Sequence, residues 1–140
     1  MLKNYASISA LPNIFNDIEK TLATHGARKI IRDYDNQGRI SAISFLVQTK
    51  MGPMAVRLPA KYDQVKRIFD EQGIRYKTEQ PYRTAWATIR DWVSAQMALL
   101  DWEMVKIEEI FLPYALNEFG ETYFDLFESG KLKPQLPSGT

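Results

Sequence analysis

The feature that most constrains the fold is a stripe of apolar residues between positions 82 and 111. Its members are Trp86, Ile89, Val93, Met97, Leu100, Met104, Ile107 and Phe111. They recur every three or four residues, which is the spacing of an amphipathic helix and close to that of a coiled-coil seam. At about 1.5 Å per residue, a helix of this length spans roughly 45 Å. The pattern predicts one long helix that either supports the rest of the fold or extends to a partner.

The first 72 residues predict a β-meander between two helices. The expected helices and strands cover residues 13–25, 27–34, 39–49, 54–58 and 60–72. Turn residues separate the strands at 35–38 and 50–53, and Gly26 and Gly73 are expected to end the two helices. Short antiparallel strands joined by such turns form a meander.

The C-terminal part is expected to be helical. Pro113 should kink or end the long helix, and residues 122–128 predict a last short helix that ends at Ser129-Gly130. We therefore expect the α+β class: a small three-stranded antiparallel meander in the order α-β-β-β-α, then the long amphipathic helix and a short final helix. Residues 1–130 are interpreted as one domain with an α-β-β-β-α part (13–72) and a helical part (82–129). Residues 1–11 are expected to form an extended arm and residues 131–140 a flexible tail.

Composition argues against several chemistries. The chain has no cysteine, so disulfides, iron–sulfur clusters and thiolate zinc sites are excluded. His25 is the only histidine, and its place at a predicted helix end favours an interaction with that end over catalysis. No phosphate-binding glycine motif or calcium loop is present. We expect no catalytic residue, no metal and no cofactor. The chain also lacks a membrane-spanning run or a signal-peptide pattern, and this favours a cytoplasmic protein.

Charge is distributed unevenly along the chain. Residues 1–80 carry 13 basic and 8 acidic side chains, whereas residues 81–140 carry 5 and 9. The two halves either attract each other within one domain, or the first presents a basic face to a nucleic acid or an acidic protein. The candidate basic residues are Arg28, Lys29, Arg32, Arg39, Lys50, Lys61, Lys66 and Arg67. The predicted order over residues 13–72 is similar to double-stranded-RNA-binding domains, although Lys61 stands where that family places several lysines.

Aromatic residues give a second candidate site on the long helix. Trp92 and Trp102 lie beside the main stripe and, with Leu99, widen its apolar face. Arg83 and Arg90 are seven residues apart and so share a face. Either the helix is buried on a broad side, or these five residues form a surface for a partner or for a homodimer through the long helix.

Four segments carry a resemblance to a known family. They are Arg57-Leu58-Pro59-Ala60, Arg83-Thr84-Ala85-Trp86, Asp91-Trp92-Val93 and Ile110-Phe111-Leu112-Pro113-Tyr114. With the order of elements, they resemble a family of small uncharacterised proteins encoded by bacteriophages and other mobile elements. The resemblance carries no catalytic residue. It implies a non-enzymatic protein in the host cytoplasm that binds a host protein or nucleoprotein, for example as an inhibitor of a defence system such as a CRISPR effector. The alternative is a nucleic-acid-binding module that uses the basic face.

Overall fold

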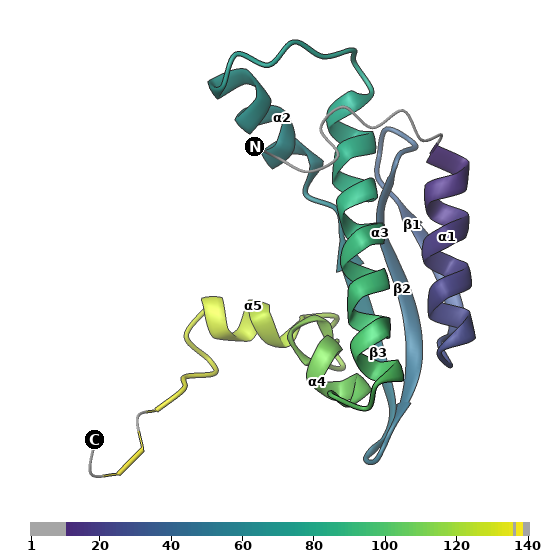
Figure 1. The fold of residues 1–140 in the computed structure, drawn as a ribbon. Coiled ribbons are helices and arrows are strands. Elements are labelled where there is room, and N and C mark those ends of the chain that lie inside the picture. The colour runs from purple at the N-terminus through teal and green to yellow at the C-terminus, as the bar shows by residue number, and fades with distance from the viewer. Residues whose placement is uncertain (1–10, 136, 139–140) are drawn as a thin grey trace.

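The fold is a three-stranded antiparallel sheet with helices on one of its faces (Figure 1). A computed structural model describes residues 11–135 and 137–138, so most of the expected N-terminal arm lies outside the described residues. The elements are α1 (Leu11–Thr24), β1 (Arg28–Tyr34), β2 (Ile40–Thr49), β3 (Gly52–Pro59), α2 (Tyr62–Glu71), α3 (Gln80–Asp101), α4 (Ile107–Phe111), the 3₁₀ turn η1 (Leu112–Tyr114) and α5 (Tyr123–Glu128). The α+β prediction and the three-stranded meander are confirmed.

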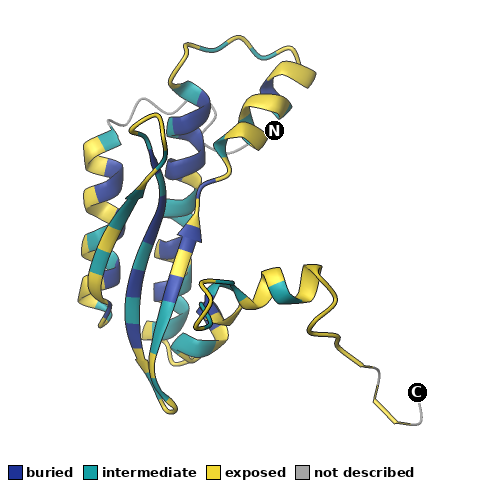
Figure 2. Cartoon of the chain, turned by 180° about the vertical axis from the view of Figure 1, so that it is seen from behind, coloured by how far each residue is buried: buried dark blue, intermediate teal, exposed yellow. Residues whose placement is uncertain are grey.

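The strands follow the order β1-β2-β3, and β2 alternates between two faces. Ile43, Phe45 and Val47 point to the helices and are buried. On the other face, Ser44 lies opposite Arg57 of β3, and its hydroxyl donates to the carboxylate of Asp33. Helices α1 and α3 lie side by side on the buried face, whereas no helix covers the opposite face in Figure 2.

Trp86 of α3 is at the centre of the core. Its side chain is fully buried, and its ring meets that of Phe15 of α1 edge-on at 5.1 Å. The indole Nε1 donates to the carbonyl of Ile40 at 3.2 Å, and the Tyr82 hydroxyl donates to the same carbonyl at 2.8 Å. Trp86 therefore ties α1, α3 and the start of β2 together, which explains why the apolar stripe of α3 faces inward.

The prediction of one continuous helix from 82 to 111 is wrong beyond Asp101. Glu103 adopts a positive φ of 56°, its N–H donates to Leu100, and the N–H of Met104 donates to Leu99. These two bonds form a Schellman motif, which ends an α-helix. The chain then turns, and α4 places Phe111 against Phe45 of β2 with ring centroids 5.2 Å apart. The stripe therefore contributes to the core from two helices.

The helix that partners α1 on the sheet is α3, and α2 packs on α3 instead. The predicted α-β-β-β-α order along the chain is confirmed, and the long helix packs on the meander through its apolar stripe. After η1, which contains Pro113, a short extended segment runs beside β3, where the N–H of Leu116 donates to Ala55. Helix α5 follows, as the sequence predicts. Within the described residues, no helix has the length and apolar character that crossing a membrane requires.

Candidate protein-interaction surface

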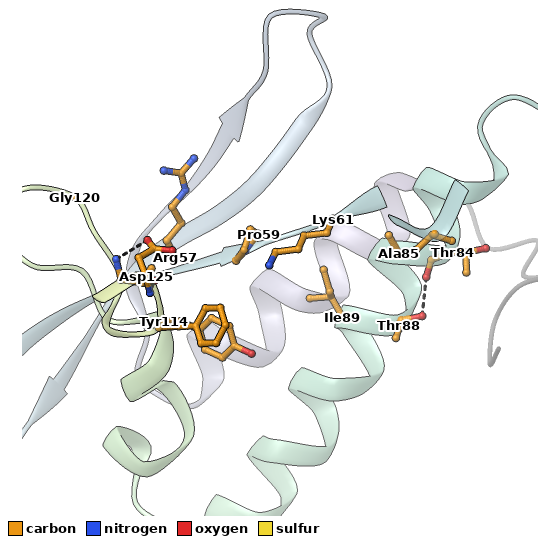
Figure 3. Close-up of a pocket in the computed structure, with 13 residues that line it drawn as sticks. Arg57, Pro59, Lys61, Thr84, Ala85, Thr88, Ile89, Tyr114, Gly120 and Asp125 are labelled. Atoms are coloured by element: carbon orange, nitrogen blue, oxygen red, sulfur yellow. Dashed lines mark hydrogen bonds between the residues drawn. The ribbon is translucent and has the colours of Figure 1, made fainter. Parts of the chain in front are cut away.

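A groove of about 670 Å³ lies where β3, α2, α3 and the C-terminal segment meet (Figure 3). Its lining is mainly apolar, with Val65 from α2, Ala85 and Ile89 from α3, and Pro59 from β3. The rings of Tyr114 and Phe124 form the side contributed by the C-terminal segment. Binding sites in proteins are commonly concave, apolar and of this size.

Two polar groups at this groove have no ion pair or hydrogen bond to a described residue: the Lys61 ammonium and the Tyr114 hydroxyl. The ammonium of Lys61 lies over the ring of Phe124, 5.9 Å from its centroid, and Lys61 forms no ion pair with the described residues. Figure 3 shows the Lys61 side chain pointing into the groove. The Tyr114 ring is held by Trp92, edge-on at 5.8 Å, and its hydroxyl makes no hydrogen bond to a described residue.

The other charged residues of the groove are engaged elsewhere. Arg57 points away from the groove in Figure 3, and its Nε lies 3.9 Å from an oxygen of Asp33 on the open face of the sheet. The Asp125 carboxylate accepts from the backbone N–H of Thr122, and the Thr122 hydroxyl accepts from the N–H of Asp125. These bonds, with Lys61 and Arg57 nearby, lower the pKa of Asp125. The carboxylate thus caps α5, and no described carboxylate forms an ion pair with Lys61.

Helix α5 presents exposed aromatic rings next to the groove. Tyr123, Phe124 and Phe127 are 40%, 45% and 47% exposed, and we call these three residues the C-terminal aromatic surface. The rings of Phe124 and Phe127 lie 6.4 Å apart. Figures 1 and 2 show α5 projecting from the body, and its main contacts are with η1. Adjoining exposed rings on a projecting element are typical of interaction sites.

The five predicted partner-binding residues differ in exposure and in position along the chain. Trp92 is half-buried and packs edge-on against Phe111 and Tyr114, so it supports the groove from inside. Trp102 is 79% exposed, but it lies ten residues further along the chain, after the end of α3. Leu99 is half-buried.

The two predicted arginines lie on α3, away from Trp102. Arg90 is half-buried, and its Nε donates to Asp91 at 3.3 Å. The Nε of Arg83 is buried without a hydrogen-bond partner in the described part of the chain. The stripe proposed as a dimer seam faces the sheet, with Trp86, Val93 and Met97 buried.

Seven of the eight predicted nucleic-acid-binding residues are divided between the two ends of the sheet, and Arg32 lies between them in the middle of β1. Arg28, Lys29 and Lys50 lie towards the β2–β3 turn, whereas Arg39, Lys61, Lys66 and Arg67 lie at the opposite end with α2. Four of them form ion pairs within the chain: Arg32 with Glu19, Arg39 with Glu79, Lys66 with Asp70 and Arg67 with Glu71. Nucleic-acid binding stays a prediction, which a gel shift across a salt series tests.

His25 joins two helix ends. Its Nδ1 lies 2.7 Å from the carbonyl of Thr21, and its Nε2 lies 2.8 Å from an oxygen of Asp101. The ring therefore connects the end of α1, where it was expected to act, to the end of α3. Among residues 11–135 and 137–138, no three His, Asp or Glu side chains are grouped in a way that could hold a metal ion.

Comparison of the chain with protein-family models, with curated proteins and with solved structures finds no match. The candidate surface therefore depends on geometry alone. Sequence reasoning missed it because residues 122–128 were interpreted only as a short helix. The signal was the density of aromatic residues in a helix of two turns, which is too short to bury three rings on a core of its own.

Proposed function

We propose that this chain is a non-enzymatic interaction protein that binds a partner protein through the groove and the C-terminal aromatic surface. The observation that carries the proposal is that α5 holds exposed aromatic rings beside an apolar groove that no described residue fills. Aromatic anchors that enter a pocket supply most of the binding energy in many interfaces.

Two further features support this location over the Trp102 end of α3. Trp102 is a single exposed ring beside a tight turn, and the described part of the chain places no other aromatic ring against it. The groove, by contrast, is built from four elements, and Trp92 fixes one of its walls through Tyr114. A preformed site loses less conformational entropy on binding.

The resemblance to phage-encoded proteins suggests the class of partner. We propose a host protein or nucleoprotein, and an inhibitor of a defence system such as a CRISPR effector is the specific form. Phage plating on a host with active CRISPR immunity tests this form. Expression of the wild-type chain should restore plating, and the Phe124→Ser/Phe127→Ser variant should not. Equal restoration by both would contradict the use of this surface.

A peptide selection tests the surface without knowledge of the partner. Random twelve-residue peptides are selected on the full-length protein, and their affinities are then measured for two variants. We expect binding to fall at least tenfold for Phe124→Ser/Phe127→Ser and to stay unchanged for Trp102→Ser, the matched control at another exposed ring. Selection of no peptide, or of peptides that lose affinity only for Trp102→Ser, would overturn the proposal.

A further inference from the structure

The groove combines apolar walls with a few polar groups, and this combination limits which ligands it can bind. Its walls are aliphatic and aromatic, from Val65 and Ile89 to the rings of Tyr114 and Phe124. The Lys61 ammonium and the Tyr114 hydroxyl, which both line it, form no ion pair or hydrogen bond with residues 11–135 or 137–138. An ammonium has only donors, and a hydroxyl can donate as well, so the complementary group is an acceptor with negative charge.

From this complementarity we propose that the groove recognises a partner segment with an acidic side chain next to an aliphatic or aromatic one. The carboxylate is bound by Lys61 and Tyr114, and the apolar neighbour packs against Val65 and Ile89. This inference rests on the proposed function, and it adds the chemistry of the partner. It also gives Lys61 a different role from the one predicted from the sequence. Lys61 would bind a carboxylate of a protein partner and not a phosphate of a nucleic acid.

The Lys61 ammonium favours a carboxylate in the groove over a basic group, and the one described carboxylate that lines the groove, Asp125, is already hydrogen-bonded. Lys61 and Arg57 are both close enough to Asp125 to lower the pKa of that carboxyl. The Asp125 carboxylate accepts from Thr122 at 2.9 Å at the start of α5, where an acidic residue also interacts favourably with the helix. A carboxylate of the partner can therefore pair with Lys61 without breaking the hydrogen bond between Asp125 and Thr122.

The cation–π contact gives Lys61 a defined position. Its ammonium lies 5.9 Å from the centre of the Phe124 ring, within the range over which a ring attracts a cation. The same ring belongs to the C-terminal aromatic surface, so the apolar and charged parts of the site are adjacent. A partner residue that packs on Phe124 brings its neighbour close to the ammonium.

The test uses the selected peptides and a pair of variants, one at the residue before α2 and one within α2. Lys61→Met removes the charge and keeps an apolar side chain of similar length. Lys66→Met makes the same change within α2, where Lys66 pairs with Asp70, 3.3 Å away. Lys61→Arg keeps the charge. Peptides are compared with versions in which each Asp or Glu is replaced by its amide.

We expect the selected peptides to be enriched in Asp or Glu beside a large apolar residue. The acid-to-amide change should weaken binding about five- to tenfold at low salt, and the ratio should shrink as salt rises. For Lys61→Met, the acid and amide forms of each peptide should bind with nearly equal affinity. For Lys66→Met and Lys61→Arg, the acid form should still bind about five- to tenfold more tightly.

Two results would overturn the inference and leave the proposed function in place. The first is selected peptides that need Phe124 and Phe127 but bind equally as acids and amides. The second is a ratio that Lys61→Met leaves unchanged. If the peptides do not depend on Phe124 and Phe127 at all, both proposals fail.

Discussion

Substitution of the two tryptophans beside the helical stripe should change the stability of the protein by very different amounts. Trp92 packs edge-on against Phe111 at 6.1 Å and Tyr114 at 5.8 Å, and its side chain is half-buried. Trp102 is 79% exposed and has no aromatic contact to a described residue. Each tryptophan is therefore replaced by alanine. The difference between the two losses in unfolding free energy gives the contribution of the interior contacts of Trp92.

The magnitudes follow from these contacts. Each edge-on aromatic pair contributes about 0.5–1.5 kcal/mol beyond the burial of area, and removal of a fully buried tryptophan costs about 3–5 kcal/mol. For the half-buried Trp92, we expect Trp92→Ala to lower the free energy of unfolding by about 2–4 kcal/mol. Trp102→Ala should change it by less than about 0.5 kcal/mol, as for most surface substitutions.

Urea unfolding followed by circular dichroism measures both values, and acrylamide quenching supplies an independent check. Trp102 should provide most of the readily quenched fluorescence, which Trp102→Ala removes. Trp92→Phe keeps a ring at the contact and should lose clearly less stability than Trp92→Ala. Equal costs for the two alanine variants, or a larger cost for Trp102→Ala, would refute this account of the α3–α4 region.

Three other substitutions test separate features of the fold. Tyr62 donates a hydrogen bond to Asp35, which raises the pKa of Tyr62 to about 12 and lowers the pKa of Asp35. Because the unfolded tyrosine ionises near pH 10 and the folded one does not, this contribution is complete below pH 10 and is lost as the pH rises towards 12. Between pH 9 and pH 11, the unfolding free energy of the wild type, measured in urea, should therefore fall by up to about 1 kcal/mol relative to that of Tyr62→Phe, after allowance for solvent screening. A difference between the two proteins that does not change with pH would contradict the assigned bond. Glu103→Gly should stabilise the protein by about 1 kcal/mol, since glycine adopts the positive φ of 56° without strain, and a loss in thermal denaturation would be the opposite result. Phe127→Ser should leave the unfolding free energy within about 0.5 kcal/mol, because that ring is about half-exposed, and a large loss would show that α5 is part of the core.

Helix ends show where the sequence was sufficient to predict the fold. Schellman bonds end α1, α2 and α5, with Gly26, Gly73 and Gly130 at the positive φ. All three ends were predicted from these glycines. The end of α3 has the same pair of bonds, but the residue at the positive φ is Glu103. Neither glycine nor proline marks that position, so the apolar spacing predicted a helix through it.

The apolar stripe continues across the break for a physical reason. Ile110 and Phe111 of α4 are buried after the chain turns, and their spacing from Met97 and Leu100 suits one helix as well as two. Periodicity reports which residues are buried but not whether the helix between them is continuous. Met104, at the turn, is exposed although it falls on the stripe.

The candidate site was less predictable than the fold because it depends on long-range contacts. Lys61, Ile89, Tyr114 and Phe124 come from four parts of the chain, and no local pattern places them together. The predicted partner-binding residues lie on or next to one helix, and the Trp92 ring packs against that of Tyr114. Lys61 was assigned to a basic series whose other members lie elsewhere or are paired.

The central claim is that the groove and the C-terminal aromatic surface form one binding site. Backbone amide chemical shifts, measured with and without a selected peptide, test it most directly. The account predicts that the largest shifts occur at Lys61 and Val65, around Ile89, and along α5, with residues 102–104 unchanged. Largest shifts at residues 102–104 or on the open face of the sheet, with α5 unaffected, would contradict it.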